Sequence, residues 1–269
     1  MNRKKFSIIV YTVCFNEELI LPHFLNYYSR IANKIVIYDN QSTDQSVNIA
    51  TSYPNVELRS FDTGGKVSEL TLTNIRRNCW KEEKSDYVIV CDADEFLYVK
   101  DLQEFLAKHH DYDVFRPVGF NMVSNKFPTD YGKLITEQVK SGAYAPAFSK
   151  MVLFKPETVR EIGYGPGSHK AYPVGFKQLK VYDALQNNAD LKLLHYKFLG
   201  LDYVTKRYAF LSSRLGEEYQ KYKYDFHFGL KAAAYKKKFL QLKILSFNCI
   251  DRRSHPLFTI AKLLAKFTR

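Results

Sequence analysis

The chain has 269 residues, of which 46% are apolar, and it carries a formal net charge of +12. This length suits one large domain with a sizeable core, and the apolar content excludes global disorder. The 12 glycines and 9 prolines are too few for a collagen-like or low-complexity chain. No stretch approaches the roughly 20 apolar residues of a membrane-spanning helix, and the apolar run at residues 7–13 is too short for a signal peptide. We therefore expect a cytoplasmic protein.

The first hundred residues alternate between strand and helix patterns. Apolar runs predict strands at residues 6–13, 34–38, 56–59 and 87–91, and helical spacing predicts helices at residues 18–30, 45–52 and 68–81. Strands that alternate with helices predict βαβ units and a mostly parallel sheet. The four cysteines form no CxxC pair, so neither a zinc site nor a disulfide framework is expected.

The middle of the chain is less regular and its end is basic. Residues 114–196 contain short strand patterns at residues 114–116, 150–154 and 191–196, and we expect this part to hold the acceptor side of a cleft. From Leu201 onward the pattern is helical. Residues 231–269 contain ten Lys or Arg and one acidic residue, a net charge of +9, so an anionic membrane surface or a nucleic acid is the expected partner of the tail.

Polar clusters follow three of the predicted strands. They are Asn16-Glu17, residues 39–44 (Asp-Asn-Gln-Ser-Thr-Asp), and residues 92–95 (Asp-Ala-Asp-Glu). A helix cap or a solvated turn would explain any one of them. Ligands of parallel sheets bind beyond the carboxyl ends of the strands, so the three together predict a nucleotide site.

Asp92 and Asp94 form an Asp-x-Asp motif at the end of an apolar strand. A second such motif, Asp111-Tyr112-Asp113, follows no strand and is attributed to chance. Two carboxylates held together repel each other unless a cation lies between them. Hard oxygen ligands with open positions suit Mg²⁺ or Mn²⁺ bound together with a diphosphate.

The three clusters resemble glycosyltransferase family 2, which has the GT-A fold. The form Asp-Ala-Asp-Glu-Phe at residues 92–96 is also similar to the family 92 transferases. Shorter matches extend the resemblance to about residue 228. It implies a Rossmann-like α/β fold with a mixed, mostly parallel sheet flanked by helices. Residues 1–200 would be the catalytic domain, with the nucleotide-sugar half at 1–100 and the acceptor half at 101–200, and residues 201–269 would be a helical basic extension.

The resemblance also implies roles for individual residues. Contacts to the nucleotide-sugar, with a UDP-sugar favoured, are expected from Phe15, Asn16, Glu17, Asp39, Asn40, Arg77, Asp92 and Lys150. A Mn²⁺ or Mg²⁺ ion is expected on Asp92, Asp94 and His195, and acceptor contacts from His169 and Glu95. An inverting transfer needs a base that takes the acceptor hydroxyl proton, and the candidates are Glu137, Asp130 and Glu95. The Glu-Asp pair usual in the family is absent after residue 95, which leaves the base open.

The predicted function is metal-dependent, hexosyltransferase-like sugar transfer to a glycan or lipid-linked acceptor, in surface polysaccharide synthesis. One alternative is a sugar-1-phosphate nucleotidyltransferase, which would need a Gly-rich basic loop where residues 13–17 have neither glycine nor a basic residue. Another is a non-enzymatic RNA-binding protein, but acids clustered at the sheet edge would repel phosphate. We therefore expect no nucleic-acid partner. The basic tail, with a predicted last helix bearing Phe258, Leu263, Leu264 and Phe267, would dock the enzyme on the cytoplasmic face of an anionic membrane.

Overall fold

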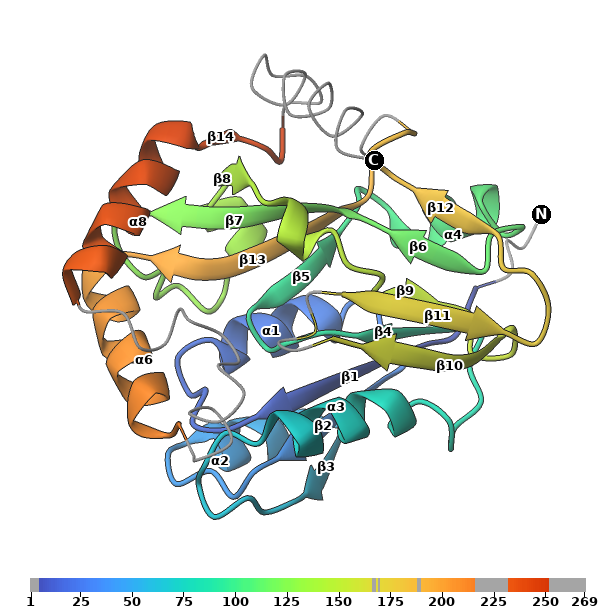
Figure 1. Ribbon diagram of the computed structural model, residues 1–269, viewed down its shortest axis with the longest axis horizontal. Helices are drawn as coiled ribbons and strands as arrows, with labels where there is room; N and C mark the ends of the chain where they lie inside the picture. The colour runs from blue at the N-terminus through green and yellow to red at the C-terminus, as the bar shows by residue number, and fades with distance from the viewer. Residues whose placement is uncertain (1–4, 166–167, 169, 188–189, 216–231, 252–269) are drawn as a thin grey trace.

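The chain folds around a seven-stranded sheet in the order β12-β6-β9-β4-β1-β2-β3 (Figure 1). The computed structural model describes residues 5–165, 168, 170–187, 190–215 and 232–251. The strands are β1 (Ile8–Cys14), β2 (Lys34–Asp39), β3 (Val56–Ser60), β4 (Tyr87–Val90), β6 (Val114–Arg116), β9 (Leu153–Phe154) and β12 (Val181–Asp183). All neighbours pair in parallel except β9, which is antiparallel to β4 and β6. The predicted mixed, mostly parallel sheet is confirmed.

A second sheet of five strands, in the order β14-β8-β7-β13-β5, packs against the first. Its strands are β5 (Glu95–Tyr98), β7 (Val118–Ser124), β8 (Ser141–Tyr144), β13 (Lys192–Leu199) and β14 (Phe247–Asn248). A separate hairpin is formed by β10 (Val159–Tyr164) and β11 (Ala171–Gly175). Both expected halves of the catalytic domain contribute strands to the seven-stranded sheet, and the proposed division of the chain stays a prediction.

Helices cover both faces of the seven-stranded sheet because alternate residues of a strand point to opposite sides. In β1, Ile8 and Val10 pack in the core that contains α1, whereas Ile9 and Tyr11 pack with Cys79 and Trp80 beside α3. The helices are α1 (Leu21–Tyr28), α2 (Ser46–Thr51), α3 (Glu69–Asn78), α4 (Leu102–Lys108), α5 (Ile135–Gln138), α6 (Leu201–Ser213) and α8 (Ala232–Leu245), with a 3₁₀ turn, η1 (Pro146–Phe148). Among the described residues, no helix combines the length and apolar composition needed to cross a bilayer.

The predicted elements of the first hundred residues are present with small shifts at their ends. Ser68, at the start of the predicted third helix, caps α3 by accepting a hydrogen bond from the Thr71 amide. The pattern had not predicted β5, β7, β8, the hairpin or β12. All four cysteines are buried free thiols.

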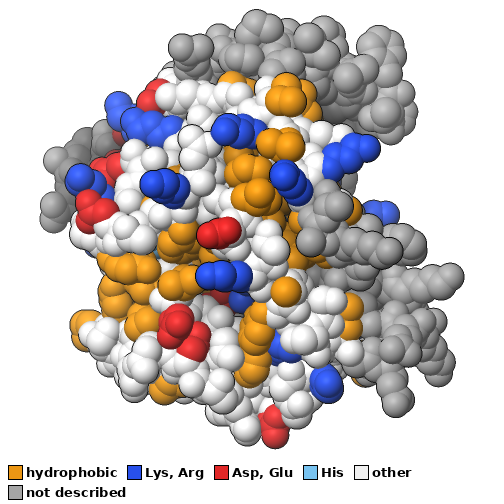
Figure 2. Space-filling view, turned by 90° about the vertical axis from the view of Figure 1, so that its left-hand side faces the viewer, with side chains coloured by type: hydrophobic (Ala, Val, Ile, Leu, Met, Phe, Trp, Pro, Cys, Tyr) orange, Lys and Arg blue, Asp and Glu red, His pale blue; other side chains and the backbone are white. Residues whose placement is uncertain are grey.

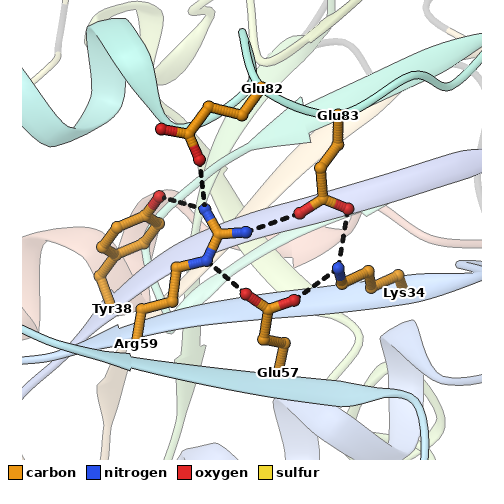
Figure 3. A network of polar contacts seen from close by, with 6 residues as sticks. All are labelled: Lys34, Tyr38, Glu57, Arg59, Glu82 and Glu83. Atoms are coloured by element: carbon orange, nitrogen blue, oxygen red, sulfur yellow. Dashed lines mark hydrogen bonds and ion pairs between the residues drawn. The ribbon is translucent and has the colours of Figure 1, made fainter.

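A charged network joins β2 and β3 to the segment that precedes β4 (Figure 3). Arg59 contacts Glu57 at 2.5 Å and Glu83 at 2.7 Å, and Lys34 contacts the same two carboxylates at 2.5 and 2.7 Å. Arg59 also donates a hydrogen bond to the Tyr38 hydroxyl, at 2.9 Å. The network therefore holds the segment that precedes β4 against β2 and β3.

Arg59→Gln is expected to lower the free energy of unfolding by about 1 kcal/mol, because partly exposed ion pairs are screened by water. The fall in melting temperature should be about 2–4 °C in a thermal unfolding scan. Arg160→Gln, at an exposed arginine on β10, is the control and should change the melting temperature little. Raised salt should reduce the difference in melting temperature between the wild type and Arg59→Gln. A difference that salt leaves unchanged would argue against an ionic contribution to stability.

Candidate active site

A cavity of about 200 Å³ lies at the carboxyl ends of β1, β2 and β4. Its walls come from the loops after these strands, from α3 and from α6. The lining includes Phe15, Glu17, Asn40, Thr63, Arg76, Asp92, Asp94, Phe148, His195, Arg207 and Arg214. All three polar clusters predicted from the sequence therefore contribute to this cavity, through Glu17, Asn40, and Asp92 with Asp94, and they meet residues far along the chain.

Asp94 and His195 form a pair in the wall of this cavity. His195 Nε2 lies 3.2 Å from Asp94 Oδ2, and His195 Nδ1 donates a hydrogen bond to Asn121 Oδ1 at 3.0 Å. The ring of Phe148 stacks on the imidazole, with the centroids 4.1 Å apart. The strand register creates this arrangement, since His195 on β13 is paired with Asn121 on β7 and with Glu95 on β5. Asn121 thereby holds the ring so that Nε2 points at the carboxylate.

This pair fits one side of a divalent metal site. A histidine that ligates through Nε2 is commonly held by a hydrogen bond from Nδ1, as Asn121 holds His195. Burial alone would raise the pKa of Asp94, but His195 outweighs it and holds that pKa below its usual value, so the carboxylate is ionised at neutral pH. Mg²⁺ and Mn²⁺ usually keep waters and substrate phosphates as further ligands, so two protein ligands are chemically sufficient.

Asp92 is engaged differently from the prediction. Its Oδ1 accepts a hydrogen bond from Arg76 Nη2 at 2.7 Å, and its Oδ2 lies 3.6 Å from Lys150 Nζ. Burial opposes ionisation, but Arg76 and Lys150 keep the pKa of Asp92 well below its usual value. The described part of the chain contains no group of three His, Cys, Asp or Glu side chains positioned to hold a metal ion. Asp92 therefore does not join Asp94 and His195 as a third ligand in this arrangement.

Of the two adjacent arginines of α3, Arg76 lines the cavity and Arg77 does not. Arg76 is buried on the side of α3 that also carries Cys79, whereas Arg77 is exposed. The two are adjacent on a helix, so they point about 100° apart, and only one can face the sheet. Arg77 therefore does not line the first cavity, and its contact with the donor stays a prediction.

Lys150 and Glu95 neutralise each other under the site. Glu95 is fully buried, and its Oε1 lies 2.7 Å from Lys150 Nζ. Burial raises the pKa of Glu95, and Lys150 opposes the rise. A carboxyl group with no exposed surface cannot contact an acceptor, so the predicted acceptor role of Glu95 is not supported by its position. Lys150 lies on the far side of Asp92 and does not line the first cavity.

The loops after β1 and β2 are held by their own polar side chains. Asn16, which has a φ of 52°, accepts a hydrogen bond from the Thr43 amide, and Asp39 accepts from both the amide and the hydroxyl of Ser42. Asn40 reaches the cavity and donates to the Thr63 hydroxyl at 2.8 Å. Phe15, Glu17 and Asn40 thus line the cavity, while Asn16 and Asp39 support the loops that form it.

Helix α6 closes the cavity, a feature that the sequence pattern did not predict. Arg207 forms an ion pair with Glu17, and the Arg214 guanidinium lies 3.6 Å from the centroid of the Phe15 ring. Arg214 Nε also donates to the Gly65 carbonyl at 2.8 Å, which ties the helix end to the loop between β3 and α3. Burial raises the pKa of Glu17 to about 7, although Arg207 opposes the rise. The spacing of Tyr203 and Arg207 had predicted the helix but not its contact with the first strand.

The predicted bases lie outside the cavity. Glu137 is exposed and accepts a hydrogen bond from the Leu134 amide at 3.1 Å, which caps α5. Asp130 is exposed and forms an ion pair with Lys133 at 3.3 Å. Both lie in a segment that packs beside α1, since Asn26 donates to the Tyr131 carbonyl. His169 lies outside the described residues, as does the predicted last helix of the tail.

A second cavity, of about 270 Å³, lies farther along the same sheet edge. Its lining includes Arg116, Pro146, Ser149, Lys150, Lys170, Tyr144, Tyr172 and Asp183. The loop containing η1 separates the two cavities, with Phe148 in the wall of the first and Pro146 and Ser149 in the wall of the second. That loop lies tightly on β7, because a Cβ atom added at Gly119 would come within 2.4 Å of the Phe148 carbonyl carbon.

The sequence profile described as "Glycosyl transferase family 2" matches residues 9–163, which is more than half of the chain. No curated protein matches the chain. One similar solved structure is glucosyl-3-phosphoglycerate synthase from Mycobacterium tuberculosis in complex with phosphoglyceric acid, at 14% identity and a TM-score of 0.29, covering 43% of this chain and 44% of that chain.

The same synthase in complex with Mn²⁺, uridine-diphosphate and phosphoglyceric acid is 14% identical, with a TM-score of 0.30 and 43% of each chain covered. HddC from Yersinia pseudotuberculosis is 12% identical, with a TM-score of 0.29, covering 45% of this chain and 60% of that chain. This chain thus spans less than two thirds of the length of these three proteins.

Proposed function

The chain belongs to glycosyl transferase family 2 and has the GT-A fold, and from that premise we propose that it transfers a sugar from a nucleotide-sugar donor to a glycan or lipid-linked acceptor. The observation that carries the proposal is the pair of Asp94 and His195, set beside Asp92 and Arg76 at the carboxyl edge of the parallel strands. A UDP-sugar is the first donor to test, and surface polysaccharide synthesis is the proposed context.

The first cavity suits the donor. Phe15 and Asn40 line the part of the wall where we place the base and ribose. Asp94 and His195 would hold Mn²⁺ or Mg²⁺, which when bound would offset the charge of the leaving diphosphate. Arg76 and Arg207 present guanidinium groups in the same walls, paired with Asp92 and Glu17, and Phe148 covers one face of the His195 ring.

The second cavity suits the acceptor, because it opens along the same edge and shares the η1 loop with the first. Asp183 is the acidic side chain in its lining; its Oδ1 accepts from the Leu185 amide at 3.0 Å and its Oδ2 lies 3.4 Å from Arg116 Nη1. A nearly buried carboxylate held by a backbone amide has a fixed direction, which a general base requires. Asp183 is therefore our candidate for the base of an inverting transfer.

Asp183→Asn is expected to lower kcat by about 10²–10⁴-fold with little change in donor affinity, because a base acts in the transition state. Glu137→Gln is the matched variant. A fall in kcat for Glu137→Gln with a normal rate for Asp183→Asn would return the base to Glu137 and contradict the placement at the second cavity. Steady-state release of the nucleoside diphosphate measures kcat for both variants.

The function itself is tested by release of nucleoside diphosphate from a panel of nucleotide-sugars, with Mn²⁺ or Mg²⁺ and with EDTA. We expect slow metal-dependent hydrolysis of one donor even without the acceptor, and loss of it in EDTA. Release of pyrophosphate from a nucleoside triphosphate and a sugar phosphate would instead indicate the nucleotidyltransferase alternative. Stabilisation by an oligonucleotide but by no nucleotide-sugar would contradict an enzyme of this class.

A further inference from the structure

Helix α8 carries apolar side chains on two opposite sides. On the inner side, Tyr235, Phe239 and Leu242 are buried in a cluster with Val204 and Tyr208 of α6. On the opposite, outer side, Leu240 and Ile244 are 48% and 81% exposed, and Leu245, on the flank at the end of the helix, is 52% exposed. The inner residues account for the packing of the helix on the protein, so the outer ones need another explanation.

The outer side of α8 is also strongly basic. Lys236, Lys237, Lys238 and Lys243 are all exposed, and the helix contains no acidic residue. Residues four apart are neighbours on a helix surface, so Lys236, Leu240 and Ile244 form one row. Figure 2, which looks onto the side where α6 and α8 lie in Figure 1, shows hydrophobic side chains interspersed with Lys and Arg side chains.

This combination fits the surface of an anionic bilayer. The cores of protein–protein interfaces are depleted of lysine, which argues against a second copy of the chain on this face. Binding of single-stranded nucleic acid relies on aromatic stacking, and the outward apolar side chains here are aliphatic. Lysines beside aliphatic side chains suit a bilayer interface, where the stems lie in the apolar layer and the ammonium groups reach the lipid headgroups.

We propose that the outer face of α8, formed by Leu240, Ile244 and Leu245 with Lys236, Lys237 and Lys243, docks on an anionic lipid bilayer. The inference goes beyond sugar transfer and does not depend on it. Helix α8 packs on α6, and α6 with its C-cap residue contributes Arg207 and Arg214 to the first cavity. Docking through α8 would therefore hold the cavity near the membrane, where a lipid-linked acceptor would be found.

The test is sedimentation of the full chain with phosphatidylcholine vesicles, with and without phosphatidylglycerol. The wild type should sediment with the anionic vesicles, and raised salt should release it. A triple variant, Lys236→Gln, Lys237→Gln and Lys243→Gln, should bind about 100-fold more weakly, because each lysine near the surface is worth about fivefold. A double variant, Leu240→Gln and Ile244→Gln, should bind about tenfold more weakly.

Two control variants carry substitutions at exposed positions elsewhere. Lys84→Gln, Lys108→Gln and Lys177→Gln together match the triple variant, and Phe176→Gln replaces an exposed apolar side chain as the double variant does. Both controls should sediment like the wild type, and all variants should keep their melting temperature and UDP binding. Unchanged binding of the two α8 variants would overturn the proposal, as would equal binding to vesicles without phosphatidylglycerol. A wild-type dimer in light scattering that becomes a monomer in the double variant would show that a second copy occupies the face.

Discussion

Asp94→Ala is expected to lower sugar transfer on the order of a thousandfold, the size of effect seen when one group that stabilises transition-state charge is removed. The carboxylate faces His195 in the wall of the first cavity, and it is part of no strand or helix. Its removal leaves the His195 ring with its hydrogen bond to Asn121, so the fold should be retained. Thermal unfolding of the variant should confirm this.

The same variant has a readout that does not depend on turnover. Mn²⁺ together with UDP should raise the melting temperature of the wild type, and this rise should be absent in Asp94→Ala. Asp111→Ala is the control, since Asp111 belongs to the other Asp-x-Asp motif and is exposed near Lys180. Normal transfer by Asp94→Ala, or full wild-type activity in excess EDTA, would contradict a metal held by Asp94 and His195.

The part of the site formed by the loops after β1, β2 and β4 could be predicted, because it depends only on recognising consecutive strands and the residues that follow them. Strands of a parallel sheet end at one edge, so the clusters at Asn16-Glu17, residues 39–44 and residues 92–95 had to come near one another once the strands were recognised. The sequence does not reveal which members of a cluster face the cavity. Asn40 lines it while Asp39 supports the loop, and that difference depends on backbone directions at the strand end.

The rest of the site depends on pairings between distant strands. His195 reaches Asp94 because β13 pairs with β5 and β7, and β5 and β7 are buried strands in which exposed and buried residues do not alternate. Only the family resemblance predicted His195 as a metal ligand. The closure by α6 rests on contacts of Arg207 and Arg214 with a strand end near the start of the chain, which no periodicity reports. A short motif match predicts Glu137 as the base, and such a match cannot show that the residue caps a helix on the surface.

The phase of helix α3 turns Arg76 toward the sheet and Arg77 toward solvent, so substitutions of these two arginines should differ strongly in their effects. Arg76→Met should lower the free energy of unfolding by about 2 kcal/mol, since breaking a buried pair leaves the Asp92 charge partly uncompensated. The effect is kept below the full range for buried pairs because Asp92 is 30% exposed and Lys150 remains 3.6 Å away. Arg77→Met, one residue along the same helix, should change stability by less than about 0.5 kcal/mol.

The ion pair of Arg76 and Asp92 should make the stability of the protein depend on pH. The folded-state pKa of Asp92 lies below its unfolded value, so the stability from its pairing is present above the unfolded pKa and is lost as the pH falls through the folded one. The difference in the free energy of unfolding between the wild type and Arg76→Met should therefore be largest near neutral pH and should decrease in acid. Urea unfolding at several pH values would measure it. Binding of the nucleotide-sugar should weaken by about tenfold or more in Arg76→Met and not in Arg77→Met, because only Arg76 lines the cavity. Equal behaviour of the two variants would mean that the pair of Arg76 and Asp92 does not organise the site.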